Sequence, residues 1–431
     1  MIKPSGQSRP PTNGAQDAPA GPPDRIGEAG SMGDDVRSDC WVRVTFGNEP
    51  GIQLNSRVEV FYGESIRSLA SEAAEALGAA GASIQIEDGG ALPWVIAARL
   101  EAAVKAADSG IVDSYLPERT IPHRTPVADR LRRSRLYLPG NTPRFMLNAG
   151  LHAPDGIILD LEDSVAPTRK KQARLLVRNA LRCHDFGPAE VMVRINQLPL
   201  GLEDLEVILP EGPEMILIPK VENPEQVQEV ETACNSIADK AGVFPPLLMP
   251  IIESGRGAWL ALDIAEASPQ VAALTIGLED YTADLGVERT AEGRESFWAR
   301  AQLVNAARAA GIQPIDTVFS DVDDVEGLRA SVLEAKALGF VGKGCIHPRQ
   351  IRVIHEAFAP TTSEIEKATK IVEAFDLARS RGEGVVALGS KMIDPPVVQR
   401  AQRTVDLAVT LGLLGQNWRE QEAEKEEASD A

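Results

Sequence analysis

Eight short apolar runs between residues 135 and 348 constrain the fold more than any other feature of the sequence. The runs are residues 135–140, 156–163, 191–196, 215–220, 247–254, 273–280, 313–320 and 343–348. Six of the seven intervals between them are long enough for a helix, and the first interval is the shortest. Apolar strands that alternate with helices predict an α/β fold, specifically a (β/α)8 TIM barrel over residues 133–382.

A doubly wound open sheet is the alternative fold for the same alternation of strands and helices. It would need a Gly-rich phosphate loop after an early strand, and the sequence has neither this loop nor a GxxxxGK[ST] motif. The barrel is therefore the preferred prediction.

Polar residues occur at the ends of most of the predicted barrel strands. They are Asp160, Glu162, Asp163, Arg194, Asn196, Lys220, Glu253, Glu279, Asp280, Asp316 and His347. The carboxyl ends of barrel strands open together at one face, where active sites of this fold lie. Ionisable residues on so many strand ends predict a shared active site rather than separate helix caps.

This set is rich in carboxylates and poor in histidine and thiol, which disfavours zinc and favours Mg²⁺, with Mn²⁺ as the other candidate. Arg194 offers a planar fork for a substrate carboxylate or carbonyl. Two rival chemistries remain: Lys220 as the amine of a Schiff-base aldolase and Cys345 as a nucleophile.

The flanking segments differ from the barrel in composition. Residues 1–30 are rich in Pro and Gly and predict a disordered leader. Residues 31–108 predict a small α+β domain of order ββαβα, with strands in 40–46, 51–63 and 82–88 and helices in 65–81 and 91–107. We expect a linker over 109–132, a C-terminal lid or helix segment over 383–415 and an acidic tail over 416–431.

Charge and composition exclude several classes of protein. The chain has 44 Lys+Arg and 63 Asp+Glu, a net charge of −19, which disfavours binding to nucleic acid or to anionic membranes. No apolar run is long enough to span a bilayer, and the start of the sequence lacks the apolar core of a signal peptide. The four cysteines form no CxxC pair. We expect a soluble cytoplasmic protein.

The barrel region, about residues 131–415, resembles the citrate lyase β subunit and its relatives in the HpcH/HpaI aldolase group. The matching motifs occur in order: RSRLYLPGNTPRF, DGIILDLEDSVAPTRKKQAR, VRIN, IPK, IIESGRG, GLEDYTADLG, KGCIHPRQI and KMIDPPVVQRAQ. The resemblance implies a TIM barrel that cleaves 3-hydroxyacyl thioesters such as citryl, malyl or citramalyl thioesters with Mg²⁺.

The resemblance also implies roles for individual residues. Glu253 and Asp280 match the metal-ligating carboxylates, and Glu253 also borders the substrate. Arg194 matches the arginine that holds the oxo-acid portion, and Arg135 matches a residue near the substrate. Asp394 matches a catalytic aspartate that reaches the site from a neighbouring subunit. Asp160 and the two carboxylates of the LEDSV segment that follows it, Glu162 and Asp163, resemble groups around metal-bound water.

The first block resembles the γ subunit of citrate lyase, its acyl carrier protein, in VRV, LNSRVE, YGESIR and GGALPWVIAARLEA. In that family a serine before the first strand carries phosphoribosyl-dephospho-CoA. Ser38 and Ser31 are the candidates here, although neither reproduces the family's ESGD motif. An unmodified domain is the alternative.

Together these resemblances predict a lyase that converts citryl-ACP or citryl-CoA to oxaloacetate and an acetyl thioester. The expected partners are the acyl-thioester substrate, further copies of the chain in a trimer or hexamer, and a citrate lyase α-type transferase. Two alternatives remain: a malyl-CoA or citramalyl-CoA lyase or malyl-CoA thioesterase with a vestigial carrier domain, and a non-catalytic carrier or scaffold subunit.

Overall fold

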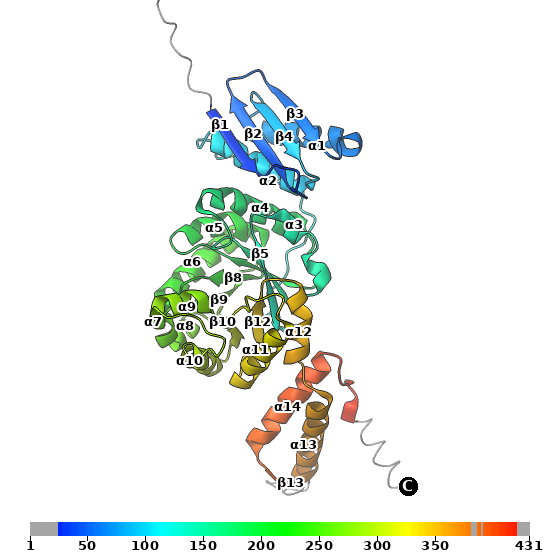
Figure 1. Ribbon diagram of the computed structural model, residues 1–431, viewed down its shortest axis with the longest axis vertical. Helices are drawn as coiled ribbons and strands as arrows, with labels where there is room; N and C mark the ends of the chain where they lie inside the picture. Colours follow the sequence, from blue (N-terminus) through cyan, green and yellow to red (C-terminus); the bar gives the residue numbers. More distant parts are fainter. Residues whose placement is uncertain (1–24, 381–385, 389–390, 420–431) are drawn as a thin grey trace, which may run out of the picture. The chain divides into compact units, whose positions relative to one another are not determined.

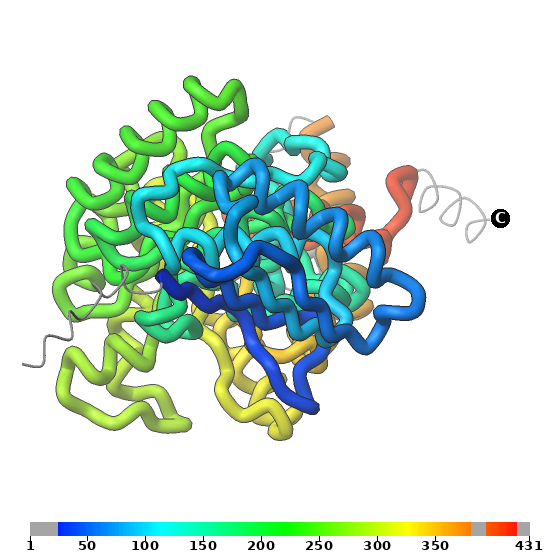
Figure 2. The backbone as a smooth tube through the Cα atoms, turned by 90° about the horizontal axis from the view of Figure 1, so that it is seen from above, coloured from blue at the N-terminus to red at the C-terminus, as the bar shows by residue number. Residues whose placement is uncertain are grey.

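The chain folds into two compact units, Met1–Leu116 and Pro117–Ala431, which are described separately. The computed structural model describes residues 25–380, 386–388 and 391–419. The path of the chain through each unit can be followed in Figures 1 and 2.

The small unit is a four-stranded sheet with two helices. Its elements are β1 (Arg25–Gly30), β2 (Cys40–Phe46), β3 (Gly51–Ser56), α1 (Glu59–Ala76), β4 (Ser83–Asp88) and α2 (Pro93–Ala107). The strand order is β1-β2-β4-β3, and only β3 and β4 run parallel. Helix α2 packs on β1 and β2, where the guanidinium of Arg99 forms a buried ion pair with Asp39 at 2.9 Å.

Two predictions for this region are wrong in part. Residues 25–30, assigned to the disordered leader, form strand β1. Their glycines allow close packing: a methyl group on Gly27 would lie 2.1 Å from the carbonyl oxygen of Ala103 in α2. The predicted strand 51–63 ends at Ser56, because its partner β4 ends at Asp88, the residue paired with Ser56. The apolar segment beyond it starts helix α1 at Glu59.

The second unit contains a closed barrel of eight parallel strands in the order β10-β11-β12-β5-β6-β7-β8-β9 (Figure 1). The strands are β5 (Ser134–Pro139), β6 (Gly156–Asp160), β7 (Glu190–Arg194), β8 (Met215–Ile218), β9 (Leu247–Ile252), β10 (Ala273–Ile276), β11 (Gln313–Asp316) and β12 (Gly342–Cys345). Each begins inside or within one residue of a predicted apolar run. The predicted TIM barrel is therefore confirmed.

Helices connect the strands and surround the barrel (Figure 1). They are α4 (Lys170–Cys183), α5 (Leu200–Ile208), α6 (Pro224–Ala241), α7 (Gly255–Trp259), α8 (Ala261–Ala265), α9 (Leu278–Leu285), α10 (Phe297–Ala309), α11 (Val325–Leu338) and α12 (Arg349–Phe358). The first interval holds only α3 (Pro143–Met146) and a 3-10 turn (Ala149–His152), as its short length predicts.

Alternate residues of the barrel strands form its interior. A cluster of buried side chains includes Ile158, Met192, Met215, Met249 and Ile315, one from each of five strands. Burial of such side chains is the main source of stability for the barrel. Because the outer faces of the same strands lie under helices, the strands are apolar on both sides.

Part of the predicted linker 109–132 belongs to the barrel unit rather than to a free tether. The guanidinium of Arg132 forms a fully buried ion pair with Glu190 at 2.7 Å, and Arg130 contacts Glu214 at 3.2 Å. The backbone N–H groups of Thr120 and Ile121 donate to the carbonyl of Arg182. These contacts fix residues 117–132 to the barrel.

The C-terminal region contains helices α13 (Thr362–Ser380) and α14 (Pro395–Thr410) and a two-stranded hairpin of β13 (Val386–Leu388) and β14 (Lys391–Ile393). The two helices share a small core that includes Trp418, which is 5 % exposed. The predicted acidic tail is therefore partly packed at its start, and its residues 420–431 lie outside the described part. Among the described residues, no helix has the length and apolar character to cross a membrane.

Candidate active site

A cavity of about 440 Å³ lies at the carboxyl ends of the barrel strands. Its polar lining residues include Arg135, Asp160, Arg194, Glu253 and Asp280. These come from five different strand or strand-end positions, so the closed barrel brings together side chains that are far apart in the sequence. Polar residues from several strand ends therefore do lie together at one face of the barrel, as the sequence predicts.

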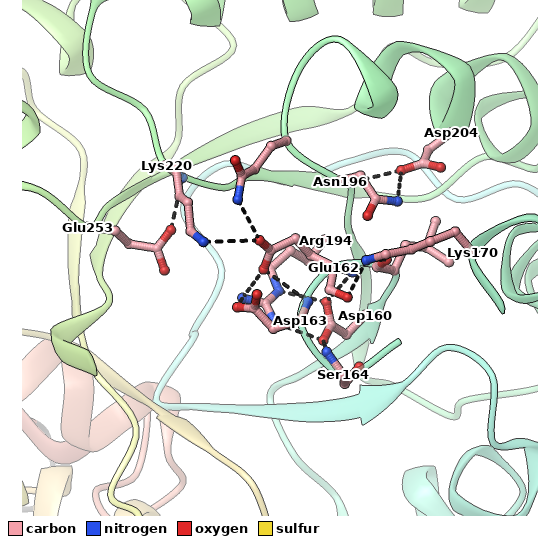
Figure 3. A network of polar contacts seen from close by, with 12 residues as sticks. Asp160, Glu162, Asp163, Ser164, Lys170, Arg194, Asn196, Asp204, Lys220 and Glu253 are labelled. Atoms are coloured by element: carbon pink, nitrogen blue, oxygen red, sulfur yellow. Dashed lines mark hydrogen bonds and ion pairs between the residues drawn. The ribbon is translucent and has the colours of Figure 1, made fainter. Parts of the chain in front are cut away.

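Arg194 and Asp160 form the shortest ion pair between residues that line this cavity (Figure 3). The guanidinium of Arg194 donates from Nε to Asp160 Oδ1 at 2.6 Å and from Nη2 to Oδ2 at 2.8 Å. Burial opposes ionisation of both side chains, but their mutual hydrogen bonds hold the pKa of Asp160 below and the pKa of Arg194 above the ordinary values. The pair is a fixed, bidentate contact.

The loop after β6 adds two more carboxylates to the same guanidinium. Nη1 of Arg194 lies 3.0 Å from Glu162 and 3.2 Å from Asp163. The backbone N–H groups of Glu162 and Ser164 donate to Asp160, so the loop wraps around that carboxylate. The LEDSV segment thus orients Arg194 at the cavity wall.

Glu253 is a buried carboxylate at the end of β9. It is 6 % exposed, and its Oε2 accepts a hydrogen bond from the backbone N–H of Lys220 at 2.9 Å. Burial raises the pKa of Glu253 to about 8, and the nearby carboxylates of Asp280 and Glu162 add to this effect. Among the described residues it has no ion pair, so this carboxylate lacks a cationic partner.

Lys220 contacts three carboxylates from one position, and Figure 3 shows two of them, Glu253 and Glu162. Its φ of 51° is in the left-handed region, which turns its backbone N–H toward Glu253. Its ammonium lies 3.2 Å from Asp280 and 3.6 Å from Glu162. Partial burial lowers the pKa of Lys220, but these contacts outweigh it and raise the pKa above its ordinary value. A Schiff-base lysine needs the opposite shift, which argues against that alternative.

Gly277, directly after β10, leaves room for Glu253. A methyl group at this position would lie 2.4 Å from Glu253 Oε1, inside the contact distance of any real side chain. The glycine therefore sets how close the two strand ends approach. Nothing in the sequence beyond its place before Leu278, Glu279 and Asp280 signals this function.

The carboxylates fit a hard divalent cation. Glu253 is buried without a cationic partner in the described part of the chain, and Asp280 is held nearby by an ammonium group that a metal could replace. Two carboxylates are enough for Mg²⁺, which keeps several waters and substrate oxygens in its shell. Among the described residues, no group of three or more His, Cys, Asp or Glu could hold a metal ion by itself.

Arg135 lies deeper in the same cavity. Its Nη1 contacts Met249 Sδ at 2.9 Å and its Nη2 donates to Thr275 Oγ1 at 3.0 Å. The ring of Tyr137, one layer nearer the mouth on the same strand, faces the guanidinium of Arg194 at 5.4 Å. The sequence did not indicate a role for Tyr137.

Several residues predicted at the mouth point elsewhere. Asp316 is fully buried and binds Arg300 of α10 at 3.1 Å and Lys343 at 2.7 Å, so its carboxylate faces the surrounding helices. Its neighbours Ile315 and Thr317 are on the opposite, inner side, as strand alternation requires. Lys343 was not recognised in the sequence.

Three further residues are also absent from the cavity lining. Asn196 donates to Asp204 through both its backbone N–H and its amide group. His347 accepts from the backbone N–H of Arg349. Cys345 is fully buried, and burial raises the pKa of its thiol to about 12, which is unsuited to a nucleophile.

Asp394 and the two candidate serines lie outside this cavity lining. Asp394 is exposed and caps helix α14, where its Oδ1 accepts from the backbone N–H of Val397. Ser31 lines a second cavity, of about 260 Å³, in the small unit together with Arg57. Ser38 has a φ of 58° and is not among the residues that line that cavity.

Comparison with known families agrees with this arrangement. The family model for HpcH/HpaI aldolase/citrate lyase matches residues 133–348. The carrier model described as malonate decarboxylase delta subunit (MdcD) matches residues 28–107, which confirms a carrier-like domain and includes part of β1. The matched carrier model takes its name from malonate decarboxylase rather than citrate lyase.

Individual relatives cover the barrel unit. The chain is 39 % identical over 284 residues to the citrate lyase subunit beta of Leuconostoc mesenteroides subsp. cremoris, covering 65 % of this chain and 94 % of that protein. It is 35 % identical over 293 residues to the human mitochondrial citramalyl-CoA lyase, covering 65 % of this chain and 86 % of that protein. Both relatives are lyases by name.

A solved structure extends the likeness to three dimensions. It is the CitE protein of Mycobacterium tuberculosis in complex with magnesium, acetoacetate and coenzyme A, at 32 % identity and a TM-score of 0.55. The match covers 65 % of this chain and 99 % of that chain. With the family model matched across the barrel and the strand-end carboxylates in place, the chain belongs to the HpcH/HpaI aldolase/citrate lyase family.

Proposed function

We propose that this lyase cleaves a 3-hydroxyacyl thioester with Mg²⁺, and that its substrate is citryl-CoA or a citryl group on a carrier. The products are oxaloacetate and an acetyl thioester. The observation that carries the proposal is the pair of carboxylates Glu253 and Asp280, which line one cavity with Arg194. The choice of Mg²⁺ is supported by the similar CitE structure, which was solved with magnesium.

The reaction is a retro-aldol cleavage of the retro-Claisen type, because the leaving carbanion is a thioester enolate. The substrate hydroxyl loses its proton, its carbon becomes a carbonyl, and the bond to the carbon next to the thioester breaks. The electron pair of that bond becomes an acyl-thioester enolate, which takes up a proton. Glu253 and Asp280 would hold Mg²⁺, which would supply positive charge for the oxygens of the oxo-acid portion.

Arg194 positions the oxo-acid portion, because a guanidinium binds carboxylate and carbonyl oxygens in a fixed plane. Asp160 holds Arg194 in place through the two hydrogen bonds at 2.6 and 2.8 Å. Such preorganisation lowers the cost of reorienting charged groups during the reaction. Asp160, Glu162 and Asp163 act through their contacts with Arg194, and would also face the water shell of a bound cation.

The final proton comes from Asp394 of a neighbouring copy of the chain, directly or through a water that it orients. Its exposed position at the start of α14, outside the cavity lining, supports this role. The proposal requires a homo-oligomer, with a trimer or hexamer expected. Mixing inactive Asp394→Asn and Arg194→Met proteins should restore part of the activity, whereas no recovery would show that each barrel is self-contained.

Removal of the metal ligands tests the core of the proposal. Glu253→Gln and Asp280→Asn should abolish Mg²⁺-dependent release of the 2-oxo acid. Glu279→Gln is the matched control, because Glu279 is adjacent to Asp280 and lines the same cavity, but its side chain is 63 % exposed and paired with Arg289. Full activity in both ligand variants would overturn the metal assignment.

The second candidate is a citramalyl-CoA or malyl-CoA lyase or a malyl-CoA thioesterase, favoured by the 35 % identity to the human protein named citramalyl-CoA lyase. These substrates differ from citryl-CoA only at one substituent of the hydroxyl-bearing carbon. A panel assay with citryl-, citramalyl- and malyl-CoA separates them. A purely non-catalytic carrier or scaffold has no use for the cavity residues, and it would release no 2-oxo acid from any member of the panel.

The small unit acts as an acyl carrier, with Ser31 as the preferred attachment point for phosphoribosyl-dephospho-CoA. Ser31 lines the 260 Å³ cavity, which is open to a covalently attached group and which also has Arg57 and the carboxylates Asp34, Glu87 and Asp88 in its lining. Intact-mass measurement on protein from its native host should show an adduct that Ser31→Ala removes and Ser38→Ala retains. An α-type transferase would then load the carrier. An unmodified mass in the native protein would favour direct use of CoA thioesters.

A further inference from the structure

Arg135 differs in its partners from four other buried arginines in the described part of the chain. Arg99, Arg132, Arg194 and Arg300 each form an ion pair with a carboxylate. Arg135 is 1 % exposed, yet among the described residues it has no ion pair. A buried cation without an anion is costly unless something else compensates it.

The contacts that Arg135 does make are weak or neutral. They are the sulfur of Met249, the hydroxyl of Thr275 and, at 3.5 Å, the backbone carbonyl of Asp316. Its Nε is buried without any hydrogen-bond partner in the described structure. An arginine offers five N–H donors, so this guanidinium retains unused capacity for an anion.

The guanidinium also lies where an anion can reach it, since Arg135 and Thr275 both line the cavity of the candidate site. Thr275 pairs in register with Ile251, two residues before Glu253 on β9. Two residues along a strand span about 6–7 Å. The guanidinium therefore lies about one layer of side chains below Glu253, near the floor of the cavity.

That spacing suits a carboxymethyl arm. A ligand whose oxo-acid group lies at the level of Glu253 and Arg194 would direct a –CH₂–COO⁻ substituent downward. Such an arm, together with one charge-assisted hydrogen bond of about 2.8 Å, spans about the same 6–7 Å. A methyl group or hydrogen at the same carbon would leave the cation unpaired.

We propose that Arg135 binds the second carboxylate of the substrate and thereby makes this lyase selective for citryl-type thioesters. The inference rests on the proposed function, because it assumes that a 3-hydroxyacyl thioester occupies this cavity. In this proposal Arg135, at the floor of the cavity, determines specificity. The metal ligands and Arg194 bind the part that citryl, citramalyl and malyl thioesters share. Sites that bind a charged group reject analogues that lack it, because their own polar group is left unpaired.

The test compares two substrates in the full-length protein with Mg²⁺. In the wild type, kcat/KM should be about 10²–10³-fold higher for citryl-CoA than for citramalyl-CoA, the size of effect expected for one buried charge pair. Arg135→Met removes the charge and keeps an unbranched side chain. It should lower kcat/KM for citryl-CoA by about the same 10²–10³-fold and change kcat/KM for citramalyl-CoA less than threefold. Arg135→Lys should retain part of the preference, because it keeps the charge without the fork.

Tyr137→Phe is the matched control, since it removes a polar group from the same face of the same strand without changing charge. Its selectivity ratio should equal that of the wild type. An unchanged ratio in Arg135→Met, or an equal loss with both substrates, would mean that Arg135 only fills the barrel interior. If the wild type cleaves neither thioester, the proposed function fails, and the specificity claim is decided by binding alone.

Binding of the 2-oxo acids tests the specificity claim without turnover. It can be measured on the wild-type protein, so it does not require that a variant folds. With Mg²⁺, the wild-type protein should bind oxaloacetate at least tenfold more tightly than pyruvate in calorimetric titrations. Equal affinity for the two acids would overturn the assignment of Arg135. In a folded Arg135→Met protein, the two affinities should converge.

Discussion

The carboxylate of Glu253 occupies the space where a side chain on Gly277 would begin. A methyl group there would lie 2.4 Å from Oε1 of Glu253. The two residues end neighbouring strands, β9 and β10, which pair through Ile252 and Ile276. The position of one metal-ligand candidate is thus set by the absence of a side chain on the next strand.

Gly277→Ala should therefore impair the site while leaving the barrel folded. We expect the added methyl group to displace Glu253, with at least a tenfold loss of activity and a destabilisation of about 1–3 kcal/mol from overpacking. Mg²⁺ titration and steady-state rates measure the first effect, and thermal unfolding measures the second. Gly255→Ala is the control, because a methyl group there meets its nearest neighbour at an ordinary 3.5 Å.

Glu253→Gln should inactivate the protein. In the absence of metal, the same substitution should stabilise the folded state at alkaline pH. Burial raises the pKa of Glu253 to about 8, so the folded state holds this proton more tightly than the unfolded state. Wild-type stability should then fall as pH rises from the ordinary glutamate value through about 8. The Gln variant lacks this loss, which denaturant titrations of metal-free protein at pH 6 and pH 9 will detect. An equal slope in both proteins would contradict the assignment.

Arg194→Lys should lose activity although it retains the positive charge. An ammonium cannot reproduce the two parallel hydrogen bonds to Asp160, which is 1 % exposed and needs them. We expect at least a 100-fold decrease in kcat/KM and a stability loss of about 1–3 kcal/mol. Lys170→Arg serves as the comparison and should change kcat/KM far less, because the hydrogen bonds of Lys170 within the described structure go to the backbone carbonyls of Leu161 and Glu162.

In the small unit, Arg99→Met should destabilise the domain by about 3–5 kcal/mol, because it leaves Asp39 buried without its counter-charge. The double variant Arg99→Met, Asp39→Asn should recover part of this loss. Hydrogen exchange should accelerate in β2 and α2 and remain unchanged in the barrel strands, since the chain forms two compact units. Faster exchange in both units would show that they unfold together.

The sequence predicts the barrel well because its strands are buried on both faces and read as short apolar runs. The same property hides which face each residue occupies. Glu253 and Asp160 point into the cavity, whereas Asp316, also at a strand end, points to Arg300 and Lys343 under the helices. Only the register of the closed barrel separates these cases.

The small unit shows two further limits of sequence patterns. Val60 and Phe61 read as strand residues, but they are 93 % and 83 % exposed at the start of α1, because the sheet offers no further partner there. The glycines of residues 25–30 suggested a flexible leader, yet Gly27 provides the close approach of β1 to α2. Tertiary neighbours decided both outcomes.

Lys220 gives the candidate site a resident counter-ion. Its ammonium lies 3.2 Å from Asp280, and its backbone N–H donates to Glu253. The negative charge of these cavity carboxylates is therefore partly neutralised before a ligand binds. A divalent cation at Asp280 would take the place of this ammonium, so the positive charge next to Asp280 would rise by one rather than by two. The released ammonium would then be available to an anionic ligand, which couples cation loading to anion capture through a single side chain.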